Sequence, residues 1–186
     1  MNIDRNFVLN LAGRSSDING FLMTIYHLVV RGNYKTIVEL GGGQSTYALV
    51  AAANKTDGQV YSHDFNTGCY TRLYPEGEGI LDKEQRFHFI AGDDLETVKL
   101  WNKPIDFLFH DTSHVYDLSK KEIDSWFPFV RRGGQIFMHD TQQEAGDGMG
   151  CGQAIDEFMK TEEGKQYSIV HLQDSYILGA SILNKL

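Results

Sequence analysis

The stretch that decides the fold is Ile37-Val38-Glu39-Leu40-Gly41-Gly42-Gly43-Gln44-Ser45, where a short apolar run ends in an acid and opens into a glycine loop. The apolar run predicts a buried strand, and the residues from Thr46 to Lys55 predict a helix with Ser45 as its N-cap. Glycines in such a loop let backbone N–H groups approach a ligand at the start of the helix. The stretch therefore predicts a ligand site, although an ordinary strand-to-helix turn would use the same residues.

The loop differs from the two commonest phosphate-binding motifs. It lacks the Gly-Lys-Ser/Thr of a P-loop, and Thr46 stands where the dinucleotide fingerprint has its third glycine. A phosphate ligand is therefore not favoured. A ligand with an amine or hydroxyl groups for Glu39, and a polar group for the loop amides, fits the residues better.

Apolar runs that alternate with helical stretches continue along the chain and predict parallel strands with crossover helices. An amphipathic helix carrying Phe21 and Ile25 precedes them, and another helix is expected from Tyr116 to Arg131, ended by Gly133-Gly134. The last two strands are separated by only Gln173-Asp174-Ser175, so they should form an antiparallel hairpin. The expected fold is α/β, a Rossmann-like doubly wound sheet of seven strands, mostly parallel with an antiparallel C-terminal hairpin. The expected strands are Thr36 to Leu40, Gln59 to His63, Phe87 to Ala91, Ile105 to His110, Gly134 to His139, Tyr167 to Leu172 and Tyr176 to Leu183.

Composition limits the classes of partner. The chain of 186 residues has 17 basic and 25 acidic residues and a net charge of −8, which argues against nucleic acid and against an anionic membrane surface. No apolar run approaches the ~18 residues of a membrane span, and no signal sequence is evident. Two cysteines without a CxxC spacing indicate neither a disulfide framework nor a thiolate zinc site. We therefore expect a cytoplasmic protein, and the amphipathic N-terminal helix leaves a homo-oligomer open.

Acidic residues follow each of the first five predicted strands, and the carboxyl ends of parallel strands share one edge of the sheet. Acids that converge there repel one another unless cations or hydroxyl-rich ligands separate them. Asp64 comes 25 residues after Glu39, close to the spacing of an acid that binds ribose hydroxyls. The residues at the five ends are Glu39, Asp64, Asp93-Asp94, His110-Asp111 and His139-Asp140.

The fourth and fifth strands bring residues suited to catalysis. Asp111 and Asp140, with His139, could hold a divalent ion such as Mg²⁺. His114 lies three residues after Asp111, and its ordinary pKa near 6.5 suits a general base at neutral pH. A buried histidine that bonds backbone is an equal interpretation of His139, and a helix-capping histidine is the alternative for His114.

These residues resemble the class I S-adenosylmethionine-dependent methyltransferases, in the branch of the macrocin O-methyltransferase and cephalosporin hydroxylase-like proteins. The resemblance rests on Asp111-Thr112-Ser113-His114-Val115-Tyr116 after the fourth strand and on His139-Asp140 after the fifth. It implies one domain over residues 1–186, with an N-terminal helical segment (1–35) and a catalytic core (36–186). His139 departs from the acidic pair that holds Mg²⁺ in metal-dependent members of the branch, and Thr112-Ser113 replaces a frequent Gly-Asp.

The resemblance also implies roles for single residues. Glu39, Gly41 and Gly43, with Ser45 beside them, would surround the methionine part of S-adenosylmethionine. Asp64 would bind its ribose, Asp93 would lie near adenine, and Asp111 would orient the acceptor. His114 would be the base and Asp111, Asp140 and His139 the metal site.

The predicted function is methyl transfer from S-adenosylmethionine to a hydroxyl of a small molecule, with Mg²⁺ as a cofactor that could assist. The alternatives are an NAD(P)-dependent oxidoreductase, because the strand, glycine turn and downstream acid overlap with its fingerprint, and a non-catalytic nucleoside-binding protein.

Overall fold

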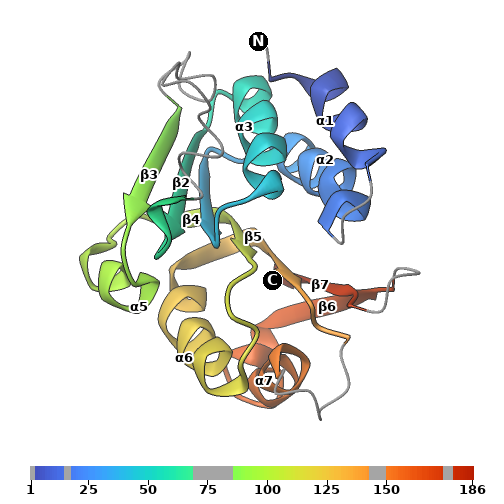
Figure 1. Cartoon of the computed structure of the whole chain (residues 1–186). Helices are drawn as coiled ribbons and strands as arrows, with labels where there is room; N and C mark the ends of the chain where they lie inside the picture. Colours follow the sequence, from blue (N-terminus) through green and yellow to red (C-terminus); the bar gives the residue numbers. More distant parts are fainter. Residues whose placement is uncertain (1–2, 15–17, 69–85, 143–149, 174–177) are drawn as a thin grey trace.

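A computed structural model describes residues 3–14, 18–68, 86–142, 150–173 and 178–186 of the chain. Its strands form one seven-stranded sheet in the order β3-β2-β1-β4-β5-β7-β6 (Figure 1). The first five strands are parallel, and β7 runs antiparallel to both β5 and β6. The strands are β1 (Thr36–Leu40), β2 (Gln59–Asp64), β3 (Phe87–Ala91), β4 (Ile105–His110), β5 (Val130–His139), β6 (Tyr167–Leu172) and β7 (Ala180–Lys185).

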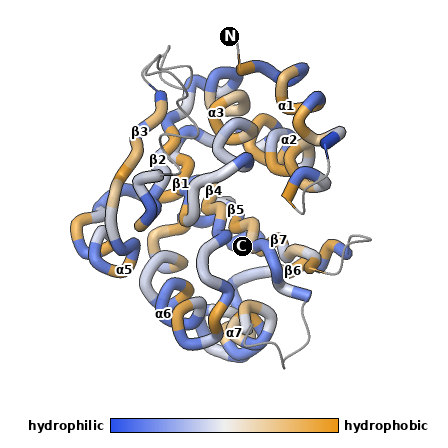
Figure 2. The backbone as a smooth tube through the Cα atoms, in the orientation of Figure 1, coloured by the Kyte–Doolittle hydropathy of each residue, from blue (hydrophilic) through white to orange (hydrophobic). Residues whose placement is uncertain are grey.

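Helices cover the two faces of this sheet. On one face lie α1 (Arg5–Ala12), the 3₁₀ turn η1 (Ile18–Phe21), α2 (Leu22–Gly32) and α3 (Gln44–Thr56). On the other lie α6 (Tyr116–Trp126) and α7 (Cys151–Phe158), while the short α5 (Asp94–Thr97) follows β3 (Figure 1). Figure 2 shows these helices banded in hydrophilic and hydrophobic colour, as expected for helices that bury one side. Among the described residues, no helix is long and apolar enough to cross a membrane.

The side chains of strand β1 contribute to the hydrophobic cores on both faces of the sheet. Ile37 packs in the core under α1, α2 and α3, whereas Val38 and Leu40 pack in the core under α6 and α7. This alternation follows from the two-residue period of a strand. All four residues from Ile37 to Leu40 are fully buried because β2 and β4 flank the strand. The carboxyl end of β1 therefore lies in the middle of the sheet.

The expected seven-stranded fold is confirmed, and several expected bounds are wrong. The helix expected from Tyr116 to Arg131 ends at Trp126, because Pro128 lies in a 3₁₀ turn from Phe127 to Phe129 and lacks an amide proton for a longer helix. Strand β5 then begins at Val130, before the glycines, and pairs with Ile105. The last strand begins at Ala180 rather than Tyr176, and residues 174–177 of the expected hairpin lie outside the described residues.

Ser45 is not the N-cap of α3, contrary to the expectation from sequence. The helix begins at Gln44 with Gly43 as its N-cap residue. The hydroxyl of Ser45 instead donates to a carboxylate oxygen of Glu39 at 2.7 Å. A buried carboxylate recruits the hydroxyl because an unpaired charge in the core would be costly.

Candidate functional site

Glu39 lies under the glycine loop rather than at its surface. Its side chain is fully buried and accepts hydrogen bonds from the hydroxyls of Ser45 (2.7 Å), Thr46 (2.8 Å) and Ser62 (2.5 Å). The Thr46 hydroxyl in turn accepts the N–H of Gly43 at 3.1 Å. Burial raises the pKa of Glu39 to about 7, although the three hydroxyl donors lower it. Glu39 therefore connects the first turn of α3 to β2 through hydrogen bonds, and it reaches the loop through the Thr46 hydroxyl.

The loop after β1 is pressed against the loop after β4. The N–H of Asp111 donates to the carbonyl of Leu40 at 2.9 Å, and Gly41 has a φ of +87°. A Cβ atom added to Gly41 would lie 1.9 Å from the carbonyl oxygen of Asp111. The next amide, that of Gly42, donates to the Asp64 carboxylate at 2.8 Å. Gly41 is therefore needed both for its backbone conformation and for the close approach of Asp111.

A cavity of about 410 Å³ opens beside these loops, at the carboxyl ends of β1 to β4. It lies at the edge where open α/β sheets bind ligands. No lysine or arginine is among the described residues that line it, whereas five of them are acidic. Such a cavity favours a ligand that is cationic or rich in hydrogen-bond donors. The lining residues are Gly41, His63, Asp64, Phe65, Gly92, Asp93, Asp94, Asp111, Thr112, Ser113, Leu118 and Glu122.

A buried acid on α6 forms part of the cavity wall. Glu122 is fully buried, and its Oε2 lies 2.6 Å from Nε2 of His110 and accepts the hydroxyl of Thr112 at 2.8 Å. Burial and the negative charge of Glu122 raise the pKa of Asp94 to about 6. The other carboxylate oxygen of Glu122 has no hydrogen-bond partner among the described residues. The carboxyl group of Asp94 interacts with Glu122 from the neighbouring α5.

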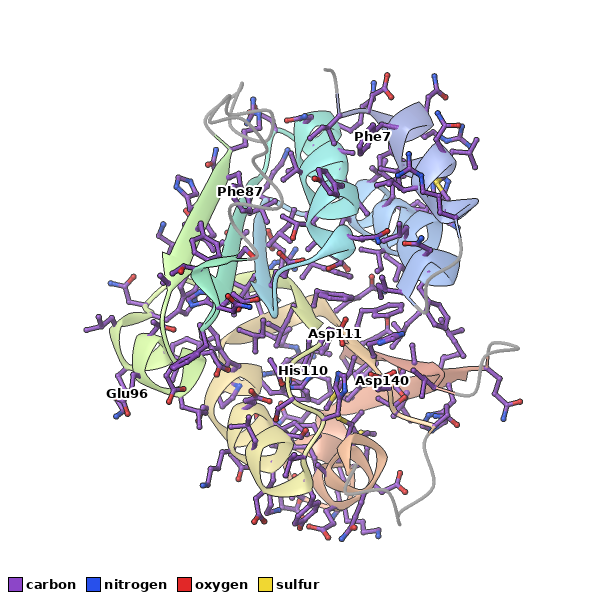
Figure 3. All side chains as sticks on the ribbon, viewed as in Figure 1. Phe7, Phe87, Glu96, His110, Asp111 and Asp140 are labelled. Carbon is purple, nitrogen blue, oxygen red and sulfur yellow. The ribbon has the colours of Figure 1, made fainter. Side chains whose placement is uncertain are left out.

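Three side chains that follow β4 and β5 meet next to this cavity. Asp111, His139 and Asp140 each place one donor atom within 4.8 Å of the donor atoms of the other two. His139 Nδ1 lies 3.1 Å from Asp140 Oδ1 and 3.4 Å from Asp111 Oδ1. Figure 3 shows Asp111 and Asp140 near the centre of the molecule, with His110 beside them. These residues could hold a divalent cation.

His114 bridges the two aspartates of this group. Its Nε2 lies 2.9 Å from Asp111 Oδ1 and its Nδ1 lies 3.0 Å from Asp140 Oδ2. Burial lowers the pKa of His114, but the hydrogen bonds and charges of the two carboxylates outweigh it and raise the pKa to about 9. The proximity of the same two carboxylates likewise raises the pKa of the buried His139 to about 10. His114 and Asp140 have φ angles of 61° and 56°, so the fold holds both in an unfavourable backbone conformation at this site.

The structure divides the predicted site residues into groups. Gly41, Asp64, Asp93 and Asp111 line the cavity. Asp111, His114, His139 and Asp140 form the neighbouring cluster. Glu39, Gly43 and Ser45 are absent from the described cavity lining. They make hydrogen bonds within and beneath the glycine loop instead.

Glu122 and His63 are cavity residues that the sequence interpretation missed. A usable signal existed for Glu122, since it occupies the buried stripe of α6 together with Ile123 and Trp126. An acid at a core-facing position of a helix needs a partner.

Comparisons with known proteins agree with this fold. Residues 38–141 match the model of a family described as "Methyltransferase domain". The fold is similar to a putative caffeoyl-CoA O-methyltransferase from Staphylococcus aureus (TM-score 0.72, 18% identity, 98% of this chain and 90% of that one). An O-methyltransferase from Bacillus cereus, solved in complex with SAH, matches with a TM-score of 0.69 and 16% identity (96% and 85%). A putative rRNA-methylase from Clostridium thermocellum matches with a TM-score of 0.70 and 14% identity (93% and 97%).

Proposed function

This chain belongs to the methyltransferase domain family, and from that premise we propose that it transfers the methyl group of S-adenosylmethionine to a hydroxyl oxygen of a small molecule. The acidic cavity at the carboxyl ends of β1 to β4 carries this proposal. S-adenosylmethionine has a positive sulfonium, an ammonium, ribose hydroxyls and an adenine amino group, and all of these suit carboxylates. The pyrophosphate of NAD⁺ would bring negative charge to a cavity whose described lining has no basic side chain.

The donor would lie across the loops that follow the first three strands. We assign the ribose hydroxyls to Asp64 and the adenine side to Asp93. The methionine part would lie against Gly41, where the backbone of the loop is closest to Asp111. Asp111 lines the cavity and also belongs to the cluster with His114, so it would stand between donor and acceptor.

Methyl transfer breaks the bond between sulfur and the methyl carbon and leaves the electron pair on sulfur. A bond between that carbon and the acceptor oxygen forms, and the hydroxyl proton must leave. We assign His114 as the group that receives this proton, with Asp111 and Asp140 holding its ring on both sides. The two carboxylates raise the pKa of His114 to about 9, not the 6.5 expected of an ordinary histidine, so the ring is protonated at neutral pH. His114 can receive the proton only after one of its ring nitrogens has lost its own, which would make methyl transfer faster as pH rises toward 9.

A divalent cation held by Asp111, His139 and Asp140 would supply positive charge beside the acceptor oxygen. The donor atoms of the three side chains fit such an ion by their convergence. The chain's own residues would bind the acceptor and fix its hydroxyl in line with the methyl group, which is a large part of catalysis in a reaction of this kind.

A small-molecule acceptor is favoured over RNA. The net charge of −8 would repel a phosphate backbone, which is normally bound through clusters of lysine and arginine. Oxygen is favoured as the methylated atom because the acceptor side presents a histidine between two carboxylates, a setting suited to removing a hydroxyl proton.

Calorimetric titration with S-adenosylmethionine, S-adenosylhomocysteine and NAD⁺ tests the proposal. We expect the first two to bind and NAD⁺ not to bind, and we expect Asp64→Asn to weaken binding about tenfold or more because ribose hydroxyls lose a charged acceptor. Asp156→Asn, at an exposed position on α7, is the matched control and should bind as the wild type does. Binding of NAD⁺ alone would refute the assignment, and donor binding without methylation of any hydroxylated acceptor would favour a nucleoside-binding protein.

A further inference from the structure

The cluster of Asp111, His139 and Asp140 contains a nitrogen donor among its three ligand atoms. In the metal-dependent enzymes that the sequence resembles, the residues after the fifth strand are an acidic pair that suits Mg²⁺. His139 replaces one of those acids in this chain. The donor set is thus two carboxylates and one imidazole, which is not the all-oxygen set typical of Mg²⁺.

Buried atoms of this cluster lack hydrogen bonds, which indicates that a ligand belongs between them. The side chain of His139 is 2% exposed and that of Asp140 is 3% exposed. Among the described residues, neither ring nitrogen of His139 has a hydrogen-bond partner. The Oδ1 atom of Asp140 has none either. Buried polar atoms in folded proteins are nearly always paired. His139 Nδ1 and Asp140 Oδ1 face each other at 3.1 Å without the angles of a hydrogen bond, as donor atoms around one cation would.

The surroundings fix the imidazole and the carboxylates in place. The ring of Phe21 packs edge-on against the ring of His139, with centroids 5.7 Å apart. His114 occupies Oδ2 of Asp140 at 3.0 Å, which leaves Oδ1 directed toward His139. Residues behind the ligands that orient them in this way are a regular feature of metal sites. Asp111, whose side chain is 23% exposed, is the ligand open to the cavity.

We propose that this site binds a first-row transition-metal ion such as Mn²⁺, Fe²⁺ or Zn²⁺ through His139, Asp111 and Asp140, in preference to Mg²⁺. Imidazole is a good ligand for these ions, whereas Mg²⁺ prefers oxygen, keeps several waters and loses them reluctantly. The buried His139, packed against Phe21, offers the ion a nitrogen where Mg²⁺ prefers an oxygen. The inference deepens the proposed function, because the ion would act at the acceptor side of the same site.

The test uses the full chain, stripped of metal and titrated with Mn²⁺, whose electron paramagnetic resonance signal changes on binding. Pulsed measurements on the bound ion report coupling to a directly ligated ¹⁴N nucleus. We expect bound Mn²⁺, a nitrogen coupling, and little displacement by a roughly hundredfold excess of Mg²⁺. These readouts need no catalytic activity and no variant.

Two variants locate the nitrogen. His139→Asp restores the acidic pair, so we expect Mn²⁺ to bind without nitrogen coupling and the preference for Mn²⁺ over Mg²⁺ to fall about tenfold or more. His27→Ala, an exposed position on α2, is the matched control and should keep the wild-type coupling.

The inference is overturned if the wild type binds no Mn²⁺, if bound Mn²⁺ shows no nitrogen coupling, if Mg²⁺ displaces it at equal concentration, or if the coupling survives in His139→Asp. A titration with S-adenosylhomocysteine on the same samples separates this from the proposed function. Binding of that compound without a metal signal would overturn only the metal inference, whereas a metal signal without nucleoside binding would overturn only the methyltransferase assignment.

Discussion

Replacing Glu39 by glutamine should change how the free energy of unfolding depends on pH. The folded pKa of Glu39 is about 7 against an ordinary value of 4.5, because burial disfavours the ionised carboxylate more than three hydroxyl donors favour it. The folded state therefore holds this proton more tightly than the unfolded state does. Between about pH 4.5 and pH 7 the unfolded chain ionises first, so rising pH lowers the free energy of unfolding. The full difference corresponds to about 3 kcal/mol at pH values above both pKa values.

Urea unfolding of the wild type and Glu39→Gln between pH 5 and pH 8 measures this effect. Glutamine keeps the shape of the side chain and can both accept from and donate to the hydroxyls of Ser45, Thr46 and Ser62. We expect the wild type to lose the greater part of about 3 kcal/mol relative to the variant across this range. Other titrating groups cancel in the comparison.

Glu96 provides a matched control, because its side chain is 66% exposed and pairs only with Lys99 in the described part of the chain. Glu96→Gln should show the pH dependence of the wild type. A difference between wild type and Glu39→Gln that stays constant with pH would refute the reasoning. The reasoning would also be refuted if the free energy of unfolding of the wild type increased relative to that of the variant as pH rises. That result would require the hydroxyl donors to outweigh burial and to lower the pKa of Glu39.

Three further substitutions test the loops, the cavity wall and the base. Gly41→Ala should weaken binding of S-adenosylhomocysteine about tenfold or more by calorimetry, because its Cβ would meet the Asp111 carbonyl, whereas Gly43→Ala, with open space around the added atom, should bind normally. Glu122→Ala should lower the free energy of urea unfolding by about 3–5 kcal/mol by leaving His110 buried without its partner, and a loss near zero would show that the pair contributes nothing. His114→Gln should lower turnover about 10²–10⁴-fold while S-adenosylhomocysteine binds unchanged, and unchanged turnover would remove His114 as the base.

The fold was predictable because its strands are short and almost wholly apolar. Strands β1, β3, β4 and β6 have the bounds expected from sequence, since each is a short run rich in apolar residues. The errors fall where a local pattern competes with sheet pairing. The end of α6 has helical spacing on both sides of Pro128, and the early start of β5 depends on a bulged pairing of Val130 with Ile105.

The site was predictable only at the level of strand ends. Parallel topology alone brings the acids after β1 to β5 to one edge, and it correctly placed Asp64, Asp93 and Asp111 around the cavity. It could not give the direction of each side chain. Glu39 is one residue before the end of β1, and the alternation of the strand directs it into the layer under α3.

The acids at this edge fall into two kinds with different physical roles. Glu39 and Glu122 are fully buried, and they stabilise the turns after β1 and β4 through hydrogen bonds with hydroxyl and imidazole groups. Asp64, Asp93 and Asp111 remain open to the cavity, so their charge is available to a ligand. Several carboxylates can coexist here because the buried ones are neutralised or hydrogen-bonded by the protein itself.

Asp111 connects the two halves of the site. It lines the cavity, its backbone carbonyl fixes the conformation of Gly41, and its carboxylate contacts both His114 and His139. The loop after β1 and the cluster of Asp111, His139 and Asp140 are therefore packed closely together, because the contact between Gly41 and Asp111 leaves no room for a Cβ atom. In the proposed reaction sulfur, methyl carbon and acceptor oxygen must be held in line, and close packing between the proposed donor and acceptor sites would help to maintain that alignment.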